Sequence, residues 1–281
     1  MMRPESFRAL GPGGFHRVAY TAWGQAGGRR AVICAHGLTR NGRDFDTLAE
    51  ALADKHLVAC PDVAGRGASD WLADPAEYTY PVYLADMAAL IAHLGVERVD
   101  WVGTSMGGLI GMMLAAQPGS PIRSLLVNDV GPFIPKAALE RLADYVGLAP
   151  TFATAKDVEA YLRDVHAPFG PLSDAEWAHL AQHSAREDEP GRWALTYDPH
   201  IGDVFRAGPI DDVDLWPVWD AISCRTLVLR GAQSDLLPAD VADAMTTRGP
   251  AAQLVEIPGV GHAPALMAAD QVAIVRDWLD K

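Results

Sequence analysis

The chain has 281 residues, of which 49% are apolar and 21% are charged. This balance is ordinary for a globular protein and excludes disordered, collagen-like and coiled-coil chains. With 36 acidic and 23 basic residues the formal net charge is −13, which repels a phosphate backbone and argues against nucleic-acid binding.

Compartment and assembly are predicted from the cysteines and the apolar runs. The three cysteines, Cys34, Cys60 and Cys224, are too few for a disulfide framework and stand in or beside apolar runs, which predicts small buried side chains and a reducing compartment. The N-terminus lacks the apolar stretch of a secretory signal, and no apolar run reaches the length of a spanning helix. We expect a soluble cytoplasmic protein, a monomer or homodimer, that binds neither membranes nor nucleic acid.

Short apolar runs alternate with stretches whose apolar residues recur every three to four positions, which predicts strands alternating with helices. This rhythm indicates an α/β fold with a mostly parallel sheet covered by helices on both faces. Residues 15–23 alternate less cleanly and predict antiparallel edge strands. The other predicted elements are strands at 31–35, 57–60, 98–102, 122–127, 226–229 and 253–257, and helices at 43–54, 80–94 and 106–116.

A long stretch, residues 133–222, separates the fourth of these six strands from the fifth and shows no strand pattern. It contains 7 basic and 16 acidic residues and 11 of the 22 aromatic residues. Because it is too long for a simple crossover, we interpret it as an inserted helical subdomain. The predicted organisation is a core domain of residues 1–132 and 223–281 and a helical cap subdomain of residues 133–222.

The sharpest motif is Gly103-Thr104-Ser105-Met106-Gly107, a G-x-S-x-G directly after the strand 98–102 and directly before the helix 106–116. A serine at such a strand-to-helix turn is held in a strained conformation with its hydroxyl above the sheet edge, and the flanking glycines avoid clashes. The helix N-terminus behind it favours negative charge. Ser105 is therefore the predicted nucleophile.

A serine hydroxyl needs a base to take its proton. His262 stands in Gly259-Val260-Gly261-His262-Ala263-Pro264, a loop just after the last strand, from which an imidazole can reach over the sheet edge. We predict His262 as the general base.

Two acids are candidates for the residue that orients the imidazole. Asp235 follows the strand 226–229, and Asp129 follows the strand 122–127. Both satisfy the chain order serine, acid, histidine. The prediction favours Asp235, with Asp129 as the alternative acid or as a structural residue of its turn.

An oxyanion hole needs two backbone N–H groups. The residue after the nucleophile, Met106, supplies one, and the loop His36-Gly37-Leu38 after an early strand supplies the other from Leu38. We expect the His36 side chain to brace this loop by hydrogen bonding.

The motifs HGLTR, DVAGRGASD, GTSMGG, NDVGP, RGAQSD and GVGHAP occur in this order, and together they resemble the α/β-hydrolase fold superfamily. The resemblance covers nearly the whole chain, with residues 133–222 in the place of that family's helical cap. It implies an eight-stranded sheet, and an acid after the strand that follows the cap, which supports Asp235. The dehalogenase and epoxide-hydrolase branches use an aspartate nucleophile, so Ser105 argues against both.

Other polar and aromatic residues carry weaker signals. Arg40 could contact substrate or brace the oxyanion loop by pairing with an acid, and Tyr197 and Trp71 are candidates for the pocket wall. His179 and His183 are four residues apart on a predicted helix, but no third ligand is evident, so we interpret them as a solvated helix face and predict no metal.

The predicted function is a serine hydrolase without cofactors that cleaves short-to-medium acyl esters through an acyl-enzyme intermediate. The acidic cap favours neutral or weakly charged small-molecule esters over polyanions, including hydroxyacid oligoesters and lactones. Two alternatives remain open: a hydrolase that cleaves carbon–carbon bonds of ketonic ring-cleavage products, and a non-catalytic ligand receptor.

Overall fold

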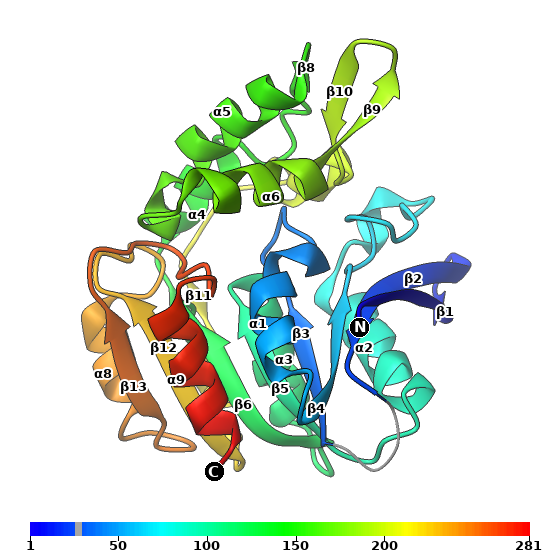
Figure 1. Cartoon of the computed structure of the whole chain (residues 1–281). Helices are drawn as coiled ribbons and strands as arrows, with labels where there is room; N and C mark the ends of the chain where they lie inside the picture. Colours follow the sequence, from blue (N-terminus) through cyan, green and yellow to red (C-terminus); the bar gives the residue numbers. More distant parts are fainter. Residues whose placement is uncertain (26–29) are drawn as a thin grey trace.

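The computed structural model describes residues 1–25 and 30–281, and its centre is an eight-stranded sheet (Figure 1). Two antiparallel pairings occur at one edge, and every other pairing is parallel. The predicted mostly parallel sheet with antiparallel edge strands is therefore confirmed. In spatial order the strands are β1 (Arg3–Gly11), β2 (Gly14–Trp23), β4 (His56–Pro61), β3 (Arg30–Ala35), β5 (Val99–Thr104), β6 (Ile122–Asn128), β12 (Arg225–Gly231) and β13 (Gln253–Ile257).

The central strands are buried on both faces, which explains why their sequences are continuous apolar runs. All six residues of β4 and five of the six in β3 are buried. The edge strand β1 instead buries only Phe7 and Ala9. Its polar residues face solvent, and its pattern is correspondingly weak in the sequence.

Helices cover both faces of the sheet (Figure 1). On one face α1 (Asp46–Leu52) and α9 (Ala269–Leu279) pack in one apolar cluster, and on the other α2 (Tyr80–His93), α3 (Met106–Ala115) and α8 (Ala239–Met245) pack in a second. The helix predicted over 43–54 is split, because a 3-10 helix, η1 (Gly42–Phe45), precedes α1. Because these strands are parallel, their C-terminal ends lie at the same edge of the sheet, between the two layers of helices.

The inserted segment, residues 133–222, lies above that edge (Figure 1). The expectation that it holds no strand is wrong. β9 consists of Ala-Arg-Glu-Asp-Glu, and four of its five residues are exposed, so charged side chains replace the alternation that would have revealed a strand. The segment comprises α4 (Lys136–Ala143), α5 (Ala155–Val165), α6 (Asp174–Ser184), α7 (Trp216–Asp220), a sheet of β8 (Thr151–Phe152), β10 (Arg192–Leu195) and β9 (Ala185–Glu189), the pair β7 (Phe133–Ile134) and β11 (Val213–Asp214), and 3-10 helices η3 (Ala167–Phe169) and η4 (Pro199–Phe205).

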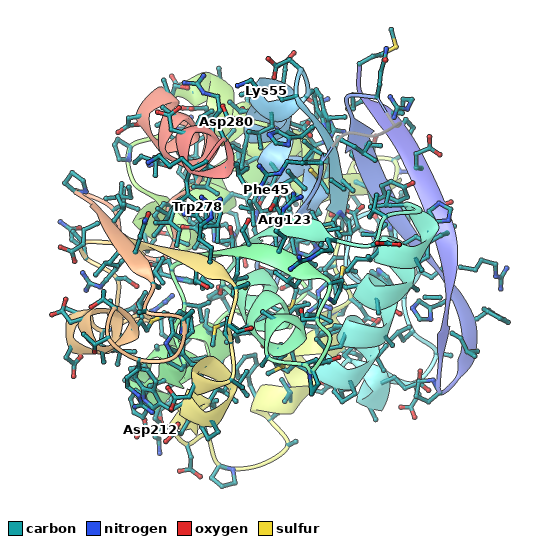
Figure 2. The ribbon with its side chains drawn as sticks, turned by 90° about the horizontal axis from the view of Figure 1, so that it is seen from below. Phe45, Lys55, Arg123, Asp212, Trp278 and Asp280 are labelled. Carbon is teal, nitrogen blue, oxygen red and sulfur yellow. The ribbon has the colours of Figure 1, made fainter. Side chains whose placement is uncertain are left out.

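The opposite end of the sheet is held by ion pairs. Asp100, fully buried, receives hydrogen bonds from Arg30, Arg123 and Ser124. Burial alone would raise the pKa of Asp100, but these bonds together keep it below its ordinary value. Seen from below, Lys55 lies beside Asp280 (Figure 2), and their charged atoms are 2.6 Å apart. The C-terminal end of α9 is thereby joined to the loop after α1.

In the part of the chain that the structure describes, no helix combines the length and the apolar character needed to cross a bilayer.

Candidate active site

Ser105 occupies the turn between β5 and α3 with a backbone φ of 52° and ψ of −116°. This conformation is strained for a residue with a side chain. It depends on the neighbouring glycines, because a Cβ at Gly107 would overlap the carbonyl oxygen of Ala35, and one at Gly103 would overlap that of Gly107. The close packing of α3 on the sheet therefore requires glycine on both sides of Ser105, at Gly103 and Gly107.

His262 lies between Ser105 and an aspartate. Its Nε2 is 3.0 Å from Ser105 Oγ, and its Nδ1 is 2.7 Å from Oδ2 of Asp129. An ionised carboxylate only accepts hydrogen bonds, so Nδ1 carries the proton and Nε2 is left to accept from the serine hydroxyl. Ser105, His262 and Asp129 therefore form one hydrogen-bonded chain.

Asp129 directly follows β6 and is fully buried. Its Oδ1 accepts from the amide of Gly231 at 2.7 Å, and its Oδ2 accepts from Ser234 Oγ at 2.7 Å in addition to His262. Its backbone φ is 58°. The neighbouring strand β12 and the loop after it therefore fix the carboxylate toward the imidazole.

The structure corrects the preference for Asp235. Both carboxylate oxygens of Asp235 accept from Arg141, and its side chain is 49% exposed. The residue lies four positions beyond the end of β12, so the chain has already left the sheet edge when it reaches Asp235. The acid that contacts His262 is Asp129.

The two amides expected to form an oxyanion hole lie on either side of Ser105. Met106 is the first residue of α3, where an N–H has no partner within the helix. Gly37 lies beside the serine, because a Cβ built on it would be 3.7 Å from Ser105 Cβ. Neither the Met106 nor the Leu38 amide donates to another group among residues 1–25 and 30–281, so both remain available to an oxygen in the pocket.

Two buried side chains hold the Leu38 loop. His36 donates from Nδ1 to the carbonyl of Gly37 at 2.7 Å and accepts at Nε2 from the amide of Val63 at 2.9 Å. The predicted bracing role of His36 is confirmed. Burial lowers the pKa of His36 to about 4, which keeps it neutral. Arg66, also fully buried, donates to the carbonyl of Leu38 at 2.9 Å.

Ser105 and His262 open into a pocket beneath the inserted segment. Arg40 lines it, but its guanidinium is bound to Asp44 at 2.7 and 2.9 Å and to Ser184 at 2.9 Å. Of the two roles predicted for Arg40, the structure shows the pairing with an acid. The remaining pocket wall is largely apolar and comes from both parts of the chain, including Phe45, Leu142, Val165, Phe169 and Leu180.

The two aromatic candidates for the pocket wall do not reach this pocket. Tyr197 lines a small adjoining cavity with Arg40 and His166. Trp71 lies outside: it is 42% exposed, and the Arg186 guanidinium is 5.5 Å from its ring centre.

Sequence reasoning missed Arg141, Tyr145 and His166, which line the pocket from the inserted segment. Burial, followed by the charges of Arg40 and His262, pushes the pKa of His166 well below its ordinary value. No motif identifies these residues, because their position depends on how the inserted segment packs over the sheet edge.

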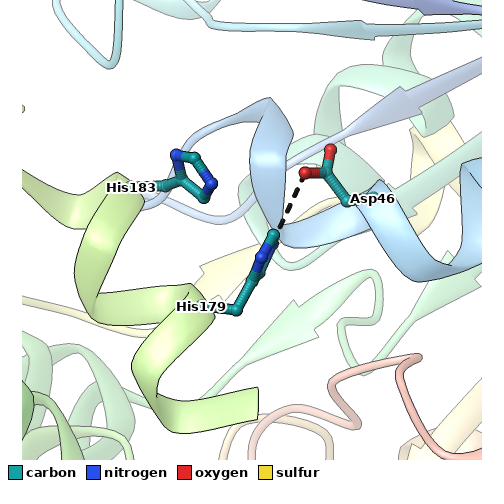
Figure 3. A group of neighbouring side chains, drawn as sticks. All are labelled: Asp46, His179 and His183. Atoms are coloured by element: carbon teal, nitrogen blue, oxygen red, sulfur yellow. Dashed lines mark ion pairs between the residues drawn. The ribbon is translucent and has the colours of Figure 1, made fainter. Parts of the chain in front are cut away.

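His179 and His183 do not form a solvated face, which corrects that interpretation. They lie partly buried against Asp46 (Figure 3), and the His179 Nε2 is 3.5 Å from Asp46 Oδ2. Arg43 binds the same carboxylate with Nε at 2.8 Å, and its Nη1 is 3.5 Å from His183 Nδ1. The Asp46 carboxylate is therefore already bound by a guanidinium, and His179 Nε2 lies 3.0 Å from the carbonyl oxygen of Arg43.

Chemically, the arrangement can take the proton from a serine hydroxyl, and two amides can stabilise an oxyanion formed beside that hydroxyl. The buried Asp129 would stabilise the imidazolium that results. These are the groups that acyl transfer requires.

Comparison with known proteins identifies the family of the chain. Residues 30–268 match the family model described as alpha/beta hydrolase fold. A 3-hydroxybutyrate-oligomer hydrolase from Cupriavidus necator is 46% identical over 275 residues, covering 95% of this chain and 94% of that protein. A pimeloyl-acyl-carrier protein methyl ester esterase from Xanthomonas campestris is 30% identical over 86% of this chain and 92% of its own length.

Among solved structures, an alpha/beta hydrolase from Novosphingobium aromaticivorans is 37% identical and superposes with a TM-score of 0.88 over 100% of this chain and 99% of that one. The family model, the sequence relatives and the eight-stranded sheet lead to the same assignment. The chain belongs to the α/β-hydrolase fold family, and its relatives are hydrolases and esterases.

Proposed function

We propose that this protein is a serine hydrolase of carboxylic esters whose substrates include short oligoesters of hydroxyacids. The hydrogen-bonded chain of Ser105, His262 and Asp129 under a partly apolar pocket is the observation that carries the proposal. The likeness over 95% of the chain to a 3-hydroxybutyrate-oligomer hydrolase supports the substrate class.

In the proposed reaction, His262 Nε2 takes the proton of Ser105 while Oγ bonds to the acyl carbon. The amides of Leu38 and Met106 stabilise the negative charge on the former carbonyl oxygen. His262 then gives its proton to the departing alcohol oxygen, which leaves an acyl group on Ser105. A water molecule then gives a proton to His262 while its oxygen bonds to the acyl carbon. The bond from that carbon to Ser105 Oγ breaks, His262 returns the proton to Oγ, and the acid is released.

The pocket wall also supports a substrate with small branched acyl groups. Leu142, Val165, Phe169 and Leu180 line the same pocket as Ser105, and these apolar side chains can contact the methyl groups of a hydroxybutyrate unit. The scissile ester would then face the amides of Leu38 and Met106.

A fluorophosphonate probe and a panel of esters test the proposal. We expect the wild type to be labelled at Ser105 and to hydrolyse 3-hydroxybutyrate dimer and trimer as well as p-nitrophenyl butyrate. The Ser105→Ala variant should lose both labelling and turnover while keeping the thermal unfolding midpoint of a folded protein. Labelling is read by mass spectrometry and products by chromatography.

A wild type that is not labelled would contradict the serine mechanism. A protein that is labelled but cleaves only a carbon–carbon bond of a ketonic substrate would contradict the ester assignment.

A further inference from the structure

The active-site pocket holds two arginines that differ in how firmly they are bound. Arg40 is 5% exposed, and all three of its guanidinium nitrogens are used by Asp44 and Ser184. This group is already neutralised by a neighbouring carboxylate. It has little capacity left for a ligand.

Arg141 lines the same pocket from the last turn of α4, and within residues 1–25 and 30–281 it pairs with one acid, Asp235. Their side chains are 34% and 49% exposed. Solvent and salt weaken an ion pair that is exposed to this degree. The Nη1 of Arg141 has no hydrogen-bond partner in the described ranges 1–25 and 30–281. Arg141 can therefore bind another carboxylate with little loss of existing interactions.

The positive charge of Arg141 also reaches the interior of the pocket. It is one of the groups that lower the pKa of the buried His166, after burial itself and the charges of Arg40 and His262. The pocket lining includes both arginines and Asp44, and Asp235, the partner of Arg141, is the second acid beside them. In a chain with a formal net charge of −13, this local balance of two arginines and two acids repels an anion less than the acidic remainder of the chain does.

We propose that Arg141 binds a free carboxylate of the substrate close to the scissile ester, and that Asp235 occupies this guanidinium while the pocket is empty. The proposal deepens the proposed ester hydrolysis and rests on it. The ligand class is a monocarboxylate ester, in which one end of the molecule is charged and the remainder is apolar.

A linear oligomer of a 3-hydroxyacid has this form. Its terminal carboxylate is separated from the oxygen of the last ester linkage by two carbon atoms, so both groups fit within one pocket. A guanidinium suits a carboxylate because two parallel N–H groups can bind its two oxygens. The carboxylate would replace Asp235 or bind to the free side of Arg141.

The test compares the 3-hydroxybutyrate dimer with its methyl ester, which lacks the charge. The quantity measured is the ratio of kcat/KM for the acid to kcat/KM for the methyl ester. We expect Arg141→Gln to lower this ratio about tenfold, mainly through KM for the acid. Arg141→Lys should give a value in between. Asp235→Asn should raise the ratio, because a competing carboxylate has been removed.

Arg192→Gln is the matched control. Arg192 also lies in the inserted segment and pairs through Nε and Nη2 with an aspartate, Asp188, but it does not line the pocket. Arg192→Gln removes the same charge as Arg141→Gln and should leave the ratio of the two kcat/KM values unchanged. The ratio of the wild type should fall with added salt, because a partly exposed charge contact is screened.

Equal effects of Arg141→Gln on both substrates would overturn the proposal. The Arg141–Asp235 ion pair would then only stabilise the packing of the inserted segment on the core. A fall of the ratio in Asp235→Asn would also overturn it. Should the wild type hydrolyse neither substrate, the proposed function fails separately. Calorimetric titration of Ser105→Ala with the dimer and its methyl ester, with and without Arg141→Gln, then decides whether the carboxylate site exists.

Discussion

At the sheet edge, Ser105 follows β5 and Asp129 follows β6, whereas Arg141 reaches the same pocket from a helix of the inserted segment. The C-terminal ends of parallel strands lie at one edge of the sheet, so the pairing of the strands is enough to bring the residues directly after them together. Helical residues above the edge meet the pocket only through the packing of the whole inserted segment.

The two regions also differ in how they are held. Asp129 is buried and fixed by Gly231 and Ser234. The inserted segment is tied to the oxyanion loop by polar contacts, among them Asn41 Nδ2 to the carbonyl of His183 at 2.8 Å and Arg40 to Ser184. Under the proposed function, the core fixes the reacting groups and the inserted segment selects what reaches them.

The largest expected effect separates the two aspartates. Asp129→Asn should lower kcat by about 10⁴-fold, because an amide cannot stabilise the imidazolium and can favour the wrong tautomer of His262. Asp235→Asn, the same change on the exposed partner of Arg141, should lower kcat for p-nitrophenyl butyrate by less than about threefold. Steady-state kinetics of both variants provide the comparison.

A severe loss in Asp235→Asn together with a mild one in Asp129→Asn would reverse the assignment of the acid. Circular dichroism and thermal unfolding of both variants check that the fold is retained, because Asp129 is buried and its replacement disturbs three hydrogen bonds.

These aspartates also show where reading the sequence stops. Ser105 and its glycines could be predicted because a local steric requirement produces the motif. That Asp129 and Asp235 each follow a strand could be predicted too. The choice between the two acids depends on contacts with residues about 100 positions away, which no local pattern reports.

In the inserted segment the sequence-based prediction of secondary structure failed for a different reason. β9 and β10 form a hairpin whose outer residues are charged and exposed, so the hydrophobic alternation that identifies strands is absent. Arg141 has the sequence context of an ordinary surface arginine on an amphipathic helix. Only the tertiary placement of α4 over Ser105 makes it a pocket residue.

The second prediction concerns acid stability and compares a histidine of the core with one of the inserted segment. Burial lowers the pKa of His36 to about 4, against about 6.5 in the unfolded chain. The unfolded state therefore binds more protons between these values. The stability that neutral His36 contributes is complete above pH 6.5 and is lost as pH falls to 4, by about 3 kcal/mol.

Urea unfolding at pH 7 and pH 4 tests this. The difference in unfolding free energy between the wild type and His36→Gln should shrink by about 3 kcal/mol at the lower pH. His183 also has its pKa lowered to about 4, first by burial and then by Arg43, but it is only partly buried. His183→Gln should show the same direction with a smaller amplitude. A difference that does not vary with pH in His36→Gln would refute the argument.

The smallest expected effect comes from the contact between the two regions. Ser184, at the C-terminal end of α6, accepts from the buried Arg40, whereas Ser173 caps the N-terminus of the same helix through the amide of Glu176. Both serine-to-alanine changes should cost about 1 kcal/mol of unfolding free energy. Only Ser184→Ala should also lower kcat/KM, by a few-fold. Ser184 binds the Arg40 side chain, and the backbone N–H of Arg40 donates to the carbonyl of Gly37, which lies beside Ser105. Equal kinetics in the two variants would mean that the inserted segment can loosen at this contact without disturbing the Leu38 loop.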